Sequence, residues 1–170
     1  GLFTWGDTSY ASYVNTLEVI EAASLYLEKN YGKTRPVFGG AKLQAFAPAE
    51  RAEKAAAIMP TLRGLASSYR RMVGHFTDDS RVLEFINSND LAVLAPLGTS
   101  CPDHFLRTKI RPLVLDVPAA GADLKAHILQ QFEAYRADYA AYYERCKHPD
   151  SPAMRDPNPV VILYPGVGMF

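Results

Sequence analysis

The sequence predicts an α/β fold, with a small, mainly parallel sheet, helices on both faces of the sheet and an N-terminal helical arm. Two continuously apolar runs, at residues 113–117 and 160–164, indicate strands that are covered on both faces. Between them, apolar residues recur at helical spacing from residue 122 to about residue 145. A strand, a crossover helix and a second strand make a right-handed βαβ unit the expected topology.

The helical arm is expected over residues 1–32. Asp7 can cap a helix, and Gly32 is a plausible terminator. Between them an apolar stripe repeats every three or four residues, formed by Tyr10, Val14, Leu17, Ile20 and Leu27. Residues 33–47 mix proline and glycine with charged residues and indicate a linker. The predicted domains are therefore the arm, 1–32, and an α/β connecting domain, 48–170.

Shorter elements are expected between the linker and the first buried strand. Pro48 fits the first turn of a helix, and Pro60 is expected to break or restart that helix, which gives two shorter helices. The remaining expected elements are a strand at 72–76, a helix at 80–86 opened by Asp78 or Asp79, and a short helix or turn around 90–95.

Composition excludes several classes of function. The chain has 170 residues, with 18 basic and 18 acidic side chains, so no long-range field favours nucleic acid or an anionic membrane. The longest apolar runs fall well short of the roughly 20 residues that a membrane span needs. Cys101 and Cys146 lack CxxC spacing, and no basic segment opens a secretion signal. The cytoplasm is the expected compartment.

The most varied polar chemistry lies just before the strand at 113–117. Arg107 and Lys109 could hold a phosphate or carboxylate, while Asp103 could fix the tautomer of His104 for proton transfer. In a second, structural interpretation, Asp103 caps a short helix, and His104 and the two cations satisfy backbone groups or pair with Asp116. The structural interpretation is favoured, because paired charges are often structural.

Two glycines, Gly166 and Gly168, follow the last predicted strand. They resemble the start of a dinucleotide-binding turn, but that motif also needs a third glycine at the opening of a helix. A tight turn at the exit of the strand is therefore favoured. The four histidines show neither HxH nor HExxH spacing, so the sequence predicts no metal site.

Several segments resemble one family of bacterial fusion enzymes. The opening Gly-Leu-Phe-Thr-Trp-Gly-Asp is similar to the end of a class II aldolase domain, where a His-Gly-Leu-Phe stretch supplies the last zinc-binding histidine. The other similar segments are residues 78–80, 102–104 with Arg107-Thr-Lys109, 156–161 and 165–170. The family joins a class II aldolase domain to a short-chain dehydrogenase domain and is commonly assigned as rhamnulose-1-phosphate aldolase/lactaldehyde dehydrogenase.

The resemblance implies that both active sites lie outside this chain. The zinc histidines and the acidic proton-transfer residue would lie upstream, with the last histidine immediately before Gly1. The glycine-rich NAD turn and the Tyr-x-x-x-Lys pair would lie downstream of Phe170. Zinc and NAD are thus implied for the parent enzyme and no cofactor for this segment, whose partners would be the flanking aldolase and dehydrogenase domains. The expected function is a non-catalytic interdomain segment of a sugar-metabolising oxidoreductase, inactive alone.

Two other functions stay open. The chain could be a small binding domain for a sugar phosphate or a nucleotide, using Arg107, Lys109, Gly166 and Gly168. It could also be an independent enzyme with His104 as acid/base. By the same family resemblance the first helix belongs to the aldolase unit, and without that unit its apolar stripe has lost its usual neighbours, so a homo-oligomer through that helix is expected.

Overall fold

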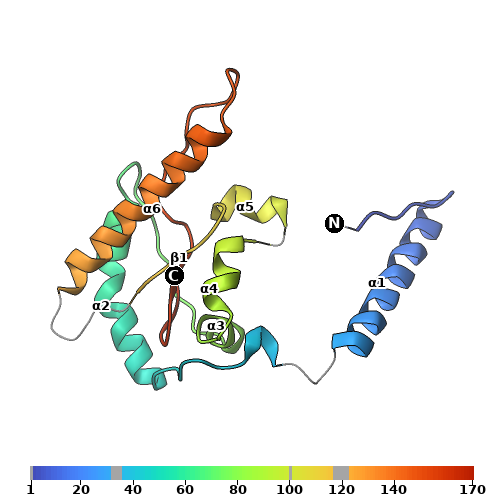
Figure 1. Ribbon diagram of the computed structural model, residues 1–170, viewed down its shortest axis with the longest axis horizontal. Helices are drawn as coiled ribbons and strands as arrows, with labels where there is room; N and C mark the ends of the chain where they lie inside the picture. Colours follow the sequence, from blue (N-terminus) through green and yellow to red (C-terminus); the bar gives the residue numbers. More distant parts are fainter. Residues whose placement is uncertain (1, 32–35, 100, 117–122) are drawn as a thin grey trace. The chain divides into compact units, whose positions relative to one another are not determined.

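The computed structural model describes residues 2–31, 36–99, 101–116 and 123–170 (Figure 1). The chain separates into two compact units, Gly1–Gly39 and Gly40–Phe170. Each unit has its own elements, and the sheet belongs entirely to the second unit. None of the helices within the described residues is long and apolar enough to cross a membrane.

The first unit consists mainly of the helix α1, Ser9–Tyr31, followed by the short 3-10 helix Val37–Gly39. The hydroxyl of Thr8 accepts a 3.1 Å hydrogen bond from the backbone amide of Ala11, so Thr8 caps the helix in place of the expected Asp7. The predicted helix is confirmed, and its expected terminator Gly32 lies outside the described residues. No residue of α1 is buried.

The second unit is built on a three-stranded mixed sheet of order β1-β2-β3. Its strands are β1 (Leu113–Val114), β2 (Ile162–Tyr164) and β3 (Gly168–Met169). β1 and β2 are parallel, as predicted, whereas β2 and β3 are antiparallel. The expectation of a mainly parallel sheet was therefore wrong in part, because a tight turn after Tyr164 reverses the chain and adds a third, antiparallel strand.

Helices α2 (Pro48–Ala66) and α6 (Leu124–Cys146) pack against each other and cover one face of the sheet (Figure 1). The carboxylate of Asp123 caps α6 by accepting hydrogen bonds from the amides of Lys125 and Ala126. The buried side chains shared by these elements include Ile58, Leu62, Leu113, Leu115, Ile128, Phe132, Tyr135, Ile162 and Tyr164. This cluster is the larger of the two hydrophobic cores.

The other face of the sheet carries α3 (Ser80–Ile86), α4 (Leu91–Leu94) and the 3-10 helix Ala95–Leu97. Ile86 and Ala95 pack there against Leu163, the one residue of β2 that points to this side. Asp79 caps α3 through a 2.9 Å hydrogen bond from the amide of Arg81, as predicted. Helices thus lie on both faces, which explains the continuously apolar strands.

Pro60 does not break the helix that contains it. α2 runs without interruption through Pro60, so the prediction of two shorter helices was wrong. Proline removes one backbone hydrogen bond and crowds the preceding turn. Here Ile58 and Leu62, on either side of Pro60, are buried in the larger core, and their burial offsets that loss.

The predicted strand at 72–76 was also wrong. These residues are extended but belong to no strand, and Val73 is 97% exposed. Only the next residue, Thr77, pairs with the sheet, through two 2.9 Å backbone hydrogen bonds with Met169. β3 is two residues long and offers this segment too little edge for a longer pairing.

Candidate functional site

The candidate site is a cavity of about 160 Å³ that holds two of the predicted binding residues, Arg107 and Lys109. Three segments form it: the end of the helix α5 (Pro102–Thr108), the stretch that follows α2, and the residues that lead into β2. Its lining residues are Ala66, Arg70, Met72, Leu106, Arg107, Lys109, Arg155, Asp156, Asn158, Pro159 and Val160. Four of these side chains are cationic and one is acidic.

Lys109 is the most constrained of the four cations. Its ammonium donates a hydrogen bond to the main-chain oxygen of Asp156 and lies 4.4 Å from the centre of the Tyr139 ring. Burial lowers the pKa of Lys109; Asp156 raises it and the nearby Arg155 lowers it. The backbone of Lys109 has φ +69°, a left-handed conformation that is strained for a residue with a Cβ.

A hydrogen-bonded network around Asn158 holds one wall of the cavity. This side chain is only 3% exposed, and its amide nitrogen donates a 2.7 Å bond to the hydroxyl of Ser68. Arg136 donates from Nε to the Asn158 carbonyl oxygen at 2.7 Å and from Nη2 to the main-chain oxygen of Leu65 at 2.8 Å. The stretch before β2 is thus tied to both α2 and α6, which keeps the cavity preorganised.

The predicted acid/base pair, Asp103 and His104, is exposed on α5 and does not line the cavity. Consecutive helical residues do not face each other, so the helix does not direct the carboxylate of Asp103 at the imidazole of His104. The predicted short helix is present, but Cys101 occupies its N-cap position and Asp103 lies in the first turn. Their catalytic role stays a prediction that this arrangement does not support.

Gly166 and Gly168 lie in and directly after the hairpin turn that joins β2 to β3. The amide of Gly166 donates a 2.7 Å hydrogen bond to the side-chain oxygen of Asn87, and a Cβ on Gly166 would come within 2.9 Å of the Phe46 ring. The turn leads into a strand, whereas a dinucleotide-binding turn opens a helix with free amides. This geometry does not fit a dinucleotide, and ligand binding at the two glycines stays a prediction.

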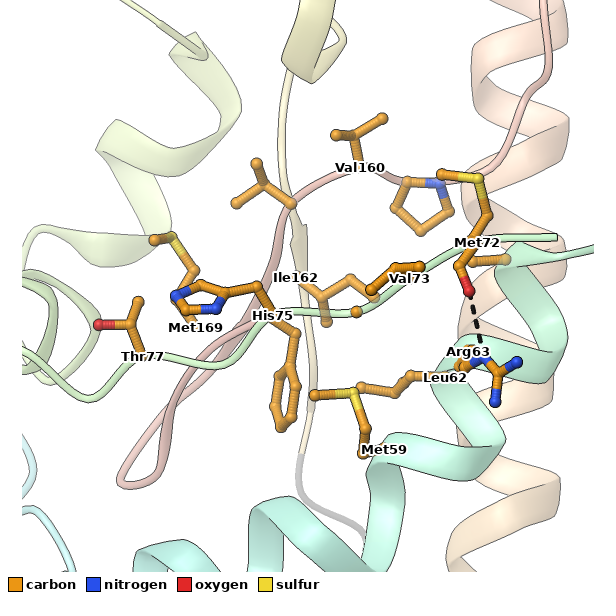
Figure 2. A pocket seen from close by; sticks show the side chains of 15 residues that line it. Met59, Leu62, Arg63, Met72, Val73, His75, Thr77, Val160, Ile162 and Met169 are labelled. Atoms are coloured by element: carbon orange, nitrogen blue, oxygen red, sulfur yellow. Dashed lines mark hydrogen bonds between the residues drawn. The ribbon is translucent and has the colours of Figure 1, made fainter.

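A larger, apolar cavity of about 290 Å³ lies beside the larger core (Figure 2). Figure 2 shows Met59, Leu62, Met72, Val73 and Met169 around it, with a hydrogen bond from Arg63 to the main-chain oxygen of Met72 that measures 3.1 Å. These residues would make apolar contacts with a ligand, and among the described residues the lining contains no acidic side chain that could pair with His75 or Arg63. In the described parts of the chain, no three His, Cys, Asp or Glu side chains gather as metal ligands.

Sequence reasoning missed Arg70, Arg155 and Asn158 as members of the polar cavity. Arg155 directly precedes a segment that the family resemblance had singled out, and Arg70 precedes the extended stretch that had been predicted as a strand. No local spacing links either arginine to Arg107, because the fold alone brings the three segments together.

Comparisons with known proteins identify the chain's family. Residues 53–170 match the family described as aldolase class II, second domain. The chain is also 36% identical over 172 residues to a Bacillus subtilis (strain 168) protein named uncharacterized oxidoreductase YuxG, a match that covers 99% of this chain and 25% of that relative. No solved structure matches the chain. It spans about a quarter of that relative's length, and it belongs to the family of class II aldolase second domains.

Proposed function

We propose that this chain is a non-catalytic interdomain segment of a longer, bifunctional aldolase/short-chain dehydrogenase. The observation that carries the proposal is the match of nearly the whole chain to one quarter of a larger oxidoreductase. In this proposal the segment joins and orients the domains on either side of it. Its partners in this proposal are the flanking aldolase and dehydrogenase domains.

The arrangement of the candidate acid/base residues supports a non-catalytic role. His104 is exposed on α5, and the cationic side chains of the polar cavity are not accompanied by a histidine. General acid/base catalysis needs the proton-transferring group within hydrogen-bond reach of a bound substrate. An independent enzyme built on His104 is therefore less well supported than a connecting segment.

The identity of the parent enzyme is a finer proposal, based on the family resemblance of the sequence. The parent would cleave rhamnulose 1-phosphate in its aldolase domain and oxidise lactaldehyde in its dehydrogenase domain, in the cytoplasm. Zinc and NAD would bind those two domains. This chain would supply the rigid α/β body between them and, through α1, a surface for pairing with a second copy.

Activity measurements on the isolated 170-residue chain test the proposal. Circular dichroism first establishes that the chain is folded. Aldol cleavage of rhamnulose 1-phosphate is then assayed with added zinc, and oxidation of lactaldehyde with added NAD, beside a complete aldolase/dehydrogenase enzyme as the positive control. The proposal expects no turnover by the folded chain. Turnover of either substrate that is lost in His104→Ala would contradict it and favour the independent enzyme.

A further inference from the structure

We propose that the polar cavity lined by Arg70, Arg107, Lys109 and Arg155 binds the phosphate group of a small phosphorylated compound. Nothing in the family match assigns a ligand to this place. The proposal is independent of the connecting role of the chain, because a non-catalytic segment and a catalytic one could equally carry such a site.

The charges of the cavity are unbalanced. Four cations line it, and Asp156 is the sole acid among its lining residues. Within the described residues, Arg70, Arg107 and Arg155 form no ion pair, whereas Arg51 and Arg111 elsewhere in the unit pair with carboxylates. The chain as a whole has equal numbers of acidic and basic residues, yet three arginines without an ion pair among the described residues line this one cavity.

The acid of the cavity is partly engaged by the backbone. One carboxylate oxygen of Asp156 accepts a 2.8 Å hydrogen bond from the amide of Asn158, and the Asp156 main-chain oxygen accepts from Lys109. The three arginines keep their guanidinium donors for a ligand. Guanidinium groups bind phosphate oxygens through paired, charge-assisted hydrogen bonds, and the ammonium of Lys109 adds a point charge.

Lys109 lies where a bound anion would stabilise its charge. Burial lowers the pKa of Lys109, Asp156 raises it and the nearby Arg155 lowers it again, and the net shift is downward, so the partial burial of the ammonium disfavours its charge. Its backbone is strained as well, and strain of this kind concentrates at ligand sites. A bound dianion would relieve the repulsion between the two cations.

The size of the cavity selects the ligand. At about 160 Å³ it has room for about five waters at their liquid volume, which suits a phosphate group or a short phosphomonoester. Whole drug-sized or dinucleotide ligands occupy clefts of roughly 300 to 1,000 Å³. The cavity therefore favours the phosphate end of a sugar phosphate over a nucleotide.

The test is to titrate the full 170-residue chain with each of three probes at constant ionic strength. Calorimetry measures the binding, and the chemical shifts of the backbone amides in NMR spectra locate it. The probes are inorganic phosphate, rhamnulose 1-phosphate and rhamnulose without its phosphate. Both phosphate-bearing probes should bind and shift amides near Arg107 and Arg155, and the unphosphorylated sugar should not. Tighter binding of one phosphate-bearing probe identifies the source of the phosphate and supports the proposal either way.

Three arginine variants make the test specific. Arg107→Gln and Arg155→Gln change exposed side chains outside the cores and should each weaken phosphate binding about tenfold. Arg81→Gln removes an exposed cation on α3, away from the cavity, and should bind as the unsubstituted chain does. Absence of binding up to about 10 mM phosphate, or equal weakening by all three variants, would overturn the proposal.

Discussion

The backbone amide of Gly166 donates a 2.7 Å hydrogen bond to the side-chain oxygen of Asn87, which joins the hairpin turn to the end of α3. Both residues are buried, so Asn87→Ala would leave the amide of Gly166 without its partner. The free energy of unfolding should fall by about 1 to 3 kcal/mol, measured by urea denaturation. Gln130→Ala, on the exposed side of α6, is the control and should change it by less than about 0.5 kcal/mol. Equal losses in the two variants would contradict this role.

Among the described residues Phe132 is the largest side chain that is fully buried, and it lies in α6. Phe132→Ala should lower the free energy of unfolding by about 3 to 5 kcal/mol, because it removes apolar contacts and leaves a cavity between α6 and the sheet. Leu129→Ala, on the same helix but 40% exposed, should cost less than half as much. Thermal or urea unfolding of both variants measures the two changes in the free energy of unfolding. A larger decrease in Leu129→Ala than in Phe132→Ala would show that Phe132 is not central to the core.

Tyr135 should make stability depend on pH in the alkaline range. Its phenol donates a 2.7 Å hydrogen bond to the main-chain oxygen of Arg111, and burial raises the pKa of Tyr135 to about 12. In the unfolded chain a tyrosine ionises near pH 10, so above that value the unfolded state binds fewer protons than the native state. The contribution of Tyr135 is therefore complete below about pH 10 and decreases as pH rises from about 10 toward 12.

The test compares the unsubstituted chain with Tyr135→Phe across that range. The variant should be less stable at pH 7, by the loss of one hydrogen bond, and its stability should decrease less steeply between pH 10 and 12. Urea denaturation at several pH values measures both effects. Parallel pH profiles for the two proteins would show that Tyr135 is not the group responsible.

The strained backbone of Lys109 predicts that glycine at this position gives a more stable protein than alanine. At φ +69° a glycine carries no Cβ penalty, so Lys109→Gly should be more stable than Lys109→Ala by about 1 kcal/mol, although both lose the ammonium. The same pair at Glu133, an exposed residue inside α6, should show the opposite order, because glycine weakens a helix. Denaturation midpoints of the four variants measure the difference. The same order at both positions would argue against strain at Lys109.

The exposed apolar side chains of α1 predict self-association. Leu17, Ile20 and Leu27 are each about half exposed, and every large apolar side chain left in water forgoes roughly 1.5 to 3 kcal/mol of burial. We expect the full chain to form a homo-oligomer and a chain starting at Gly40 to be monomeric, as measured by light scattering. A monomeric full chain at high micromolar concentration, or equal association of both chains, would contradict a pairing role for α1.

The candidate site could be predicted only where its residues are neighbours in sequence. Arg107 and Lys109 are two residues apart, and their charges alone suggested an anion site. Arg70 and Arg155 join them because the residues that follow α2 and the segment that leads into β2 line the same cavity, an arrangement that depends on packing around the sheet. His104 shares its short helix with Arg107 but lies one turn before it, and only the end of that helix, at Leu106 and Arg107, lines the cavity.

The amino-acid sequence by itself determined the elements whose signals are local. The apolar period of α1 and α6, the Asp79 cap of α3 and the continuously apolar β1 and β2 were all predicted, because they depend on residues within a few positions of each other. Tertiary structure decided the rest. Burial of Ile58 and Leu62 kept α2 continuous through Pro60, and the pairing of β2 with β3 made the sheet mixed. For α2 the deciding energy came from contacts with residues distant in sequence, which override local preference. For β3 it came from backbone pairing with β2 across the turn at residues 165–167 and from the pairing of Met169 with the distant Thr77.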